Sequence, residues 1–140
     1  MRSVFVLIDS DESESTFKIL DSFSTNYENI QWVYIDDKND PVLYIQFDHQ
    51  KYLLNEIESP ENNSLVEIIK SYQVIQIDVS GRHSGDKEVL FVVKELLSKF
   101  NGFAMDDYSD HLWHLIEIQN GAKYNELNFF DYNGWNLKNH

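Results

Sequence analysis

The 140-residue chain is long enough for one ordinary domain, and a composition with 42% hydrophobic and 14% aromatic residues supports a packed core. Its 24 acidic and 11 basic residues give a formal net charge of −13, which repels phosphate backbones and anionic membranes and attracts basic proteins. The sequence contains no cysteine, which excludes disulfide bonds and thiolate chemistry. We therefore expect a basic protein as partner, and neither a nucleic acid nor a membrane.

The N-terminal segment lacks the features of a secretory signal. Its apolar run, Val4–Ile8, is shorter than the roughly 7–15 residues of a signal-peptide core, and acidic residues follow it. No run in the sequence approaches the roughly 18–20 apolar residues of a membrane span. We expect a cytoplasmic protein.

The first half of the chain predicts three strands and one helix. Val4–Ile8 is apolar on both faces, which is typical of an interior strand. Two further β-rich runs, Ile30–Ile35 and Val42–Phe47, flank an Asp-Asp-Lys-Asn-Asp-Pro turn and predict a β-hairpin with an acidic tip. Apolar residues at steps of three and four predict a helix that carries Phe17, Leu20, Phe23 and Tyr27.

The second half alternates helices and strands. Ser64 followed by Glu67 is a capping-box pattern that predicts the start of a helix, and the alternation in Val74–Val79 predicts a strand with one buried face. Asp86–Phe100 is the clearest helix, because its apolar residues recur at steps of three and four and its terminal charges suit the helix dipole. We expect Leu96 to lie on its buried face.

The region after this helix is less regular. Asn101 and Gly102 predict the end of the helix, and a short strand is expected over Phe103–Met105. The segment Leu112–Gln119 fits a short helix slightly better than a strand, and both stay open. From Ala122 to His140 the apolar residues show no regular period.

These elements predict an α+β fold in a single domain over residues 1–140. We expect a mixed, mainly antiparallel sheet of about five strands packed with three to four helices. A split βαβ arrangement of the ferredoxin type is one way to connect them. The longest polar stretch, Glu56–Ser64, is interpreted as a loop rather than as a linker between domains.

The densest polar cluster is Asp106–His114, where three carboxylates and two imidazoles could bind a divalent metal. Its spacing matches no zinc framework, and neighbouring side chains on a turn usually diverge, so we predict no metal and no cofactor. A second interpretation is an acidic loop in which Ser109 or Asp110 caps the following helix. A third is a recognition loop that uses Tyr108 and Trp113 as contacts, although Trp113 is equally well explained as a core residue.

Other motifs give little support for catalysis. Gly81–Asp86 lacks the spacing of a phosphate-binding loop, and the carboxylate of Asp86 would oppose an anion. The sequence also lacks the Gly-x-Ser-x-Gly motif of a nucleophile elbow. We predict no catalytic residues, and therefore a protein that is not an enzyme.

Two segments, Asn101–Trp113 and Phe129–Trp135, resemble parts of bacterial immunity proteins that are encoded beside polymorphic or contact-dependent growth inhibition toxins. The resemblance covers the C-terminal third of the chain. These proteins often carry threonine where this chain has His114. The resemblance implies a non-enzymatic inhibitor that binds one toxin in the producing cell.

An acidic inhibitor gains association rate when its target is basic, as a nuclease is. We therefore predict an immunity protein that binds and neutralises a cognate toxin domain, a basic nuclease, through an acidic and aromatic surface. The alternative is a small metal-assisted hydrolase that uses the Asp106–His114 cluster. The predicted partner-binding residues are Asp36, Asp37, Asp40, Asp106, Asp107, Tyr108, Asp110 and Trp113.

Overall fold

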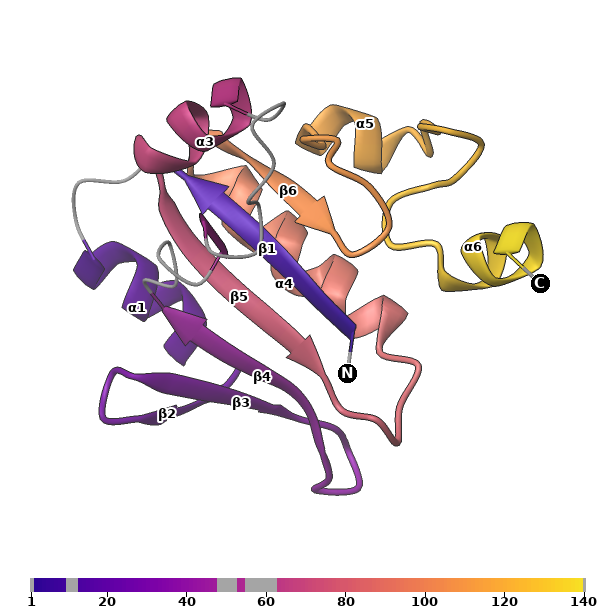
Figure 1. Ribbon diagram of the computed structural model, residues 1–140. Coiled ribbons are helices and arrows are strands. Elements are labelled where there is room, and N and C mark those ends of the chain that lie inside the picture. Colours follow the sequence, from indigo (N-terminus) through magenta and orange to yellow (C-terminus); the bar gives the residue numbers. More distant parts are fainter. Residues whose placement is uncertain (1, 10–12, 48–52, 55–62, 140) are drawn as a thin grey trace.

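A computed structural model describes residues 2–9, 13–47, 53–54 and 63–139 of the chain (Figure 1). Its centre is one sheet of six strands: β1 (Arg2–Ile8), β2 (Thr25–Tyr27), β3 (Gln31–Ile35), β4 (Pro41–Phe47), β5 (Gln73–Val79) and β6 (Gly102–Asp106). The helices described are α1 (Ser13–Asp21), α3 (Asn63–Lys70), α4 (Asp86–Lys99), α5 (Leu115–Gln119) and α6 (Tyr132–Asn139). The α+β fold is confirmed, with every pair of neighbouring strands antiparallel.

The sheet contains the predicted split βαβ arrangement. Its strand order is β2-β3-β4-β5-β1-β6, so β5 and β6, which α4 connects, lie on either side of β1. In the same way β1 and β4, which α1 and the β2–β3 hairpin connect, lie on either side of β5. The β2–β3 hairpin is therefore an addition that extends the sheet beyond β4.

The two faces of the sheet bury different helices. Val4, Val6 and Ile8 of β1 join the larger core, to which α1 and α4 also contribute. Phe5 and Leu7 point to the opposite face, where Ile69 of α3 covers them. This division follows from the alternation of side chains along a strand and explains why β1 is apolar at every central position.

The clearest predicted helix is confirmed. Leu96 of α4 is fully buried in the larger core, and Figure 1 shows α4 behind the sheet. No helix in the described part of the chain combines the length and the apolar character needed to cross a membrane.

The helix predicted to carry Phe17, Leu20, Phe23 and Tyr27 is shorter than expected. It ends at Asp21, and Tyr27 belongs to β2, a strand that the sequence analysis missed. The hydroxyls of Ser22 and Ser24 donate hydrogen bonds to the last helical carbonyls, those of Ile19 and Leu20. Such local bonds compete with helix continuation.

Two further predictions differ from the structure, and one open alternative is resolved. Ser64 lies inside α3 and is therefore not its N-cap. Within Leu112–Gln119, a helix forms over Leu115–Gln119. In the C-terminal region, where no regular element was predicted, α6 forms after Asp131, whose carboxylate accepts a hydrogen bond from the amide of Gly134. Most of the predicted Glu56–Ser64 loop lies outside the described residues.

Candidate functional site

The register of the sheet brings the two acidic sequence clusters to the same end of the molecule. Arg2 of β1 pairs with Val79, and Val79 also pairs with Leu43, next to the β3–β4 tip. Asp106 pairs with Val4. The β3–β4 tip, the β5–α4 loop, the start of β1 and the loop after β6 therefore lie together, and we call this the hairpin end of the sheet.

The β3–β4 tip is built around one carboxylate. Asp36 Oδ1 accepts hydrogen bonds from the backbone amides of Lys38 and Asp40, each at 2.9 Å. The hydrogen bond from the Asp40 amide is the largest of the influences that hold the pKa of Asp36 below its ordinary value. Asp37, next in the turn, is exposed. The predicted acidic tip is thus a locally ordered turn.

Two residues of the β5–α4 loop hold this tip. His83 Nε2 lies 3.1 Å from Asp40 Oδ2 and 3.6 Å from Asp36 Oδ2. Arg82 forms an ion pair with the other carboxylate oxygen of Asp40. Sequence reasoning treated this loop as a connection and did not single out His83. Only the sheet register, which spans more than forty positions, places the ring beside the tip.

Arg2 connects the β5–α4 loop to the C-terminal region. Its guanidinium donates to the carbonyls of His83 and Ser84 and pairs with Asp86 at 3.4 Å. The same group lies 5.3 Å from the ring centre of Phe130 and 5.2 Å from that of Tyr132. The charge of Arg2 therefore already has partners within this acidic end of the molecule.

The loop after β6 is anchored by its acidic residues. Asp106 is only 6% exposed, and its two carboxylate oxygens accept hydrogen bonds from the amides of Tyr108, at 3.1 Å, and Phe130, at 2.7 Å. Burial raises the pKa of Asp106 above its ordinary value, against the effect of these hydrogen bonds. Asp107 accepts a hydrogen bond from the amide of Ser3 at 2.7 Å. Both side chains therefore fix the loop to the sheet.

Two predicted contact residues are not accessible to a partner. Trp113 is 1% exposed, packs against Phe129 and pairs with Ala104 through backbone hydrogen bonds, so it is a core residue. Asp106 is buried in the same region. The prediction that these two side chains form part of an exposed surface is wrong, because the C-terminal segment packs over both.

Tyr108 is half-buried. Its ring stacks between those of Phe130, with centroids 6.0 Å apart, and Trp135, at 5.5 Å. Burial raises the pKa of Tyr108 to about 12. In contrast, Asp107 and Asp110 are exposed, so the loop presents carboxylates but only part of its predicted aromatic surface.

The two histidines of the Asp106–His114 cluster have separate roles. His111 Nε2 lies 3.1 Å from a carboxylate oxygen of Glu117, and its ring stacks on Tyr124. His114 is exposed at the N-cap of α5, and its amide donates to Glu117. Neither Ser109 nor Asp110 caps this helix. Among the described residues, this cluster is not one that brings three possible ligand atoms within 4.8 Å of one another.

A different group of residues places possible metal ligands together. Asp36, Asp40 and His83 each offer one ligand atom, and these atoms lie within 4.8 Å of one another. Among the described residues this is the group that brings three such atoms so close. No local sequence pattern indicates this group, because its members come from two separate loops.

A hollow of about 490 Å³ lies at the hairpin end, between the β5–α4 loop and α6. Its lining includes Arg2, His83, Asp86 and Tyr132. The Tyr132 ring is 40% exposed and provides an aromatic surface that the sequence analysis did not select. The hollow offers space for a side chain from a partner.

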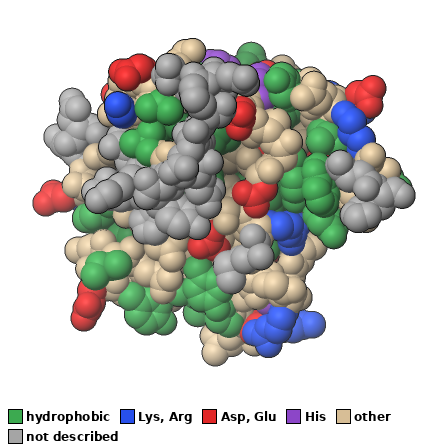
Figure 2. Space-filling view, in the orientation of Figure 1, with side chains coloured by type: hydrophobic (Ala, Val, Ile, Leu, Met, Phe, Trp, Pro, Cys, Tyr) green, Lys and Arg blue, Asp and Glu red, His purple; other side chains and the backbone are tan. Residues whose placement is uncertain are grey.

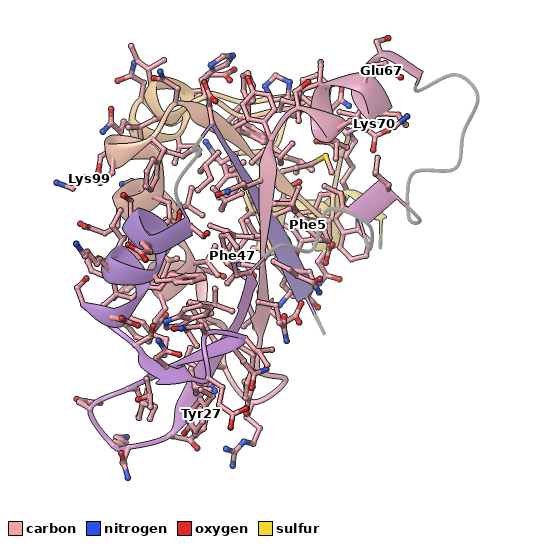
Figure 3. All side chains as sticks on the ribbon, turned by 90° about the vertical axis from the view of Figure 1, so that its left-hand side faces the viewer. Phe5, Tyr27, Phe47, Glu67, Lys70 and Lys99 are labelled. Atoms are coloured by element: carbon pink, nitrogen blue, oxygen red, sulfur yellow. The ribbon has the colours of Figure 1, made fainter. Side chains whose placement is uncertain are left out.

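Acidic side chains also lie outside the hairpin end. Figure 2 shows Asp and Glu side chains spread over the visible face, rather than gathered in one continuous patch. Glu67 and Lys70 project from α3 at the other end of the molecule (Figure 3) and form an exposed ion pair. The hairpin end is therefore distinguished by two ordered acidic loops at the same end of the sheet, not by acidity alone.

Comparisons with protein-family models, with curated proteins and with solved structures found no match.

Proposed function

We propose that this chain is an immunity protein that binds and neutralises a cognate toxin domain in the cytoplasm of the producing cell. The toxin domain is basic, as a nuclease is, and it binds at the hairpin end of the sheet. The observation that supports this most is that both acidic loops lie at the same end of the sheet, with Asp37, Asp107 and Asp110 exposed.

The charge of the molecule favours such a partner. A net charge of −13 steers a basic protein towards the chain, and the local arrangement of carboxylates then selects the orientation. Because a nuclease groove is positively charged, acidic loops can occupy the positions of its substrate phosphates. Inhibition then requires binding alone, without catalysis.

The loops are ordered before any partner binds. Asp36 is fixed by two amides, and Asp107 by the amide of Ser3. An ordered surface loses less conformational entropy on association than a flexible one. We therefore propose that Asp36, Asp40 and Asp106 maintain the surface, whereas Asp37, Asp107 and Asp110 form ion pairs with the toxin.

The aromatic residues of the proposed surface differ from those predicted from the sequence. Trp113 supports the fold from within, and Tyr108 contributes only its accessible edge. We propose that Tyr132, which lines the hollow beside Arg2 and is 40% exposed, is the principal aromatic contact. Partly exposed aromatic rings next to a polar rim are typical of binding hot spots.

The test is binding and protection with the toxin domain encoded beside this gene. The variant Asp37→Asn/Asp110→Asn removes two charges at the hairpin end. The control Glu14→Gln/Glu67→Gln removes two charges from exposed positions on α1 and α3. We expect the first pair, but not the control, to lower the association rate constant by about tenfold at low salt.

Ionic strength sharpens this test. Raising the salt concentration slows association of the parent protein and reduces the difference between parent and variant. The same variant is expected to protect cells less well against the toxin. Equal effects of the two double variants, or an association rate that does not respond to salt, would show that the hairpin end is not the interface.

A further inference from the structure

Three possible ligand atoms converge where the β3–β4 tip meets the β5–α4 loop. His83 Nε2 lies 3.1 Å from Asp40 Oδ2 and 3.6 Å from Asp36 Oδ2. All three side chains are partly accessible, so an ion can reach them from solvent. The set is a mixed nitrogen and oxygen donor group from two loops, as transition-metal sites often are.

The other oxygen of each carboxylate already has partners. Asp36 Oδ1 accepts two backbone amides, and Asp40 Oδ1 pairs with Arg82. These contacts leave one oxygen of each carboxylate facing the imidazole. Secondary contacts that orient ligands in this way are a regular feature of metal sites.

The spacing suits a small divalent ion. Ligands about 2.0–2.2 Å from a tetrahedral zinc ion lie roughly 3.3 Å from one another. The two separations from His83 Nε2, 3.1 and 3.6 Å, are close to this value, and the two carboxylate oxygens are within 4.8 Å of each other. Small side-chain rotations are therefore enough to complete the geometry.

We propose that Asp36, Asp40 and His83 form a binding site for a divalent transition-metal ion of the zinc class. The ion bridges the tip and the loop and keeps a fourth position for water or for a ligand from another molecule. This site goes beyond the proposed inhibition and does not depend on it. It also differs from the Asp106–His114 cluster, for which the sequence analysis expected no metal.

Two features set the strength of the site. An ion on His83 Nε2 places the ring proton on Nδ1, which is buried and has no hydrogen-bond acceptor among the described residues. Loss of the hydrogen-bond acceptor for the second ring nitrogen of a metal-binding histidine lowers metal affinity by roughly 10–100-fold. The guanidinium of Arg82 also competes for Asp40, but its side chain is 72% exposed and can move away. We therefore expect reversible binding rather than a permanently bound ion.

The experiment is calorimetric titration of the full chain with zinc chloride, after chelator treatment and removal of the chelator. We expect one zinc ion per chain. His83→Ala and, independently, Asp40→Asn should each weaken binding by about tenfold or more, whereas the control His114→Ala should change it by less than about twofold. Circular dichroism shows whether each variant is folded, and two independent variants keep the test informative.

Arg82→Ala is expected to change the zinc affinity in the opposite direction. Because it removes a cation that competes for Asp40, it should strengthen zinc binding. A merely structural role of Arg82 in holding the tip would weaken it instead. Zinc should also shift the ring resonances of His83 in the nuclear magnetic resonance spectrum, before those of His111.

Two results would overturn the proposal. One is the absence of zinc binding by the parent protein. The other is zinc affinity that neither His83→Ala nor Asp40→Asn changes. Neither result bears on toxin binding, which the charge variants at Asp37 and Asp110 test separately.

Discussion

The two acidic loops at the hairpin end are alike in sequence and different in structure. Asp36–Asp40 forms the tip of a hairpin, where one carboxylate orders the turn and Asp37 points to solvent. In the loop after β6, Asp106 is buried and its carboxylate binds the amide of Phe130, a residue 24 positions away. A run of aspartates therefore does not by itself indicate an exposed surface.

The difference comes from where each carboxylate finds its hydrogen-bond donors. The amide donors to Asp36 are in its own turn, so these two hydrogen bonds need no distant segment. The donors to Asp106 include the C-terminal segment, which packs over the loop and removes it from water. Burial of an acceptor is tolerated only when such donors are present.

The largest effect that separates the loops is expected at Trp113, which follows the second loop. Trp113→Ala removes a fully buried ring and should lower the free energy of unfolding by about 3–5 kcal/mol. Chemical denaturation followed by circular dichroism measures this change. Ile116→Ala, at a position 65% exposed on α5, should change it by less than about 0.5 kcal/mol. A small effect at Trp113 would place this side chain on the surface after all.

A smaller effect is expected when one carboxylate in each loop is replaced, the buried Asp106 and the exposed Asp37. Asp106→Asn replaces one acceptor oxygen by an amide donor, which leaves a backbone amide of Tyr108 or Phe130 unpaired and should cost about 1–3 kcal/mol. Asp37→Asn makes the same chemical change at an exposed position and should change stability by less than about 0.5 kcal/mol. If the two variants are equally stable, the structural distinction between the loops is wrong.

The smallest effect concerns pH and the contact between His111 and α5. The amide of His114, followed by the side chain of His111, holds the pKa of Glu117 below its ordinary value. The folded state therefore binds this proton less readily than the unfolded state. The stabilisation is complete above the ordinary glutamate pKa, about 4.3, and is lost as the pH falls through the lowered value.

Comparison of the parent with Glu117→Gln measures this contribution. At neutral pH the variant should be less stable by less than about 1 kcal/mol, because it loses a charge that solvent partly screens. The difference should disappear in acid, as the parent carboxylate becomes protonated. A difference that stays constant from pH 7 to the acid limit would show that the charge of Glu117 does not contribute.

The candidate site was predictable only in part. Asp37, Asp107 and Asp110 are exposed and acidic, as expected from a turn composition. His83 and Tyr132 were missed, because one lies in a connection and the other begins a helix with no apolar period. Asp106 was assigned to the surface and Trp113 was left open between a contact and a core residue, since one sequence does not show which segment will cover a loop.

The sequence by itself determined the elements whose signal is local. Periodic apolar residues specified α4, and alternating or continuous apolar runs specified β1, β3, β4 and β5, because each pattern reports which faces are buried. The turn residues of the β3–β4 tip were also sufficient, because they favour the local backbone conformation of a turn. The serine-rich end of α1 was misjudged where local side-chain bonds to the helical carbonyls outweighed apolar spacing.

Only the tertiary structure decided which residues meet. The pairing of β4 with β5 brings His83 to Asp36 and Asp40. The place of β1 between β5 and β6 brings Arg2 to the C-terminal aromatic rings. The fold also closes the C-terminal segment over Asp106 and Trp113. These contacts join positions far apart in the chain, and their free energy depends on packing and desolvation that no local pattern records.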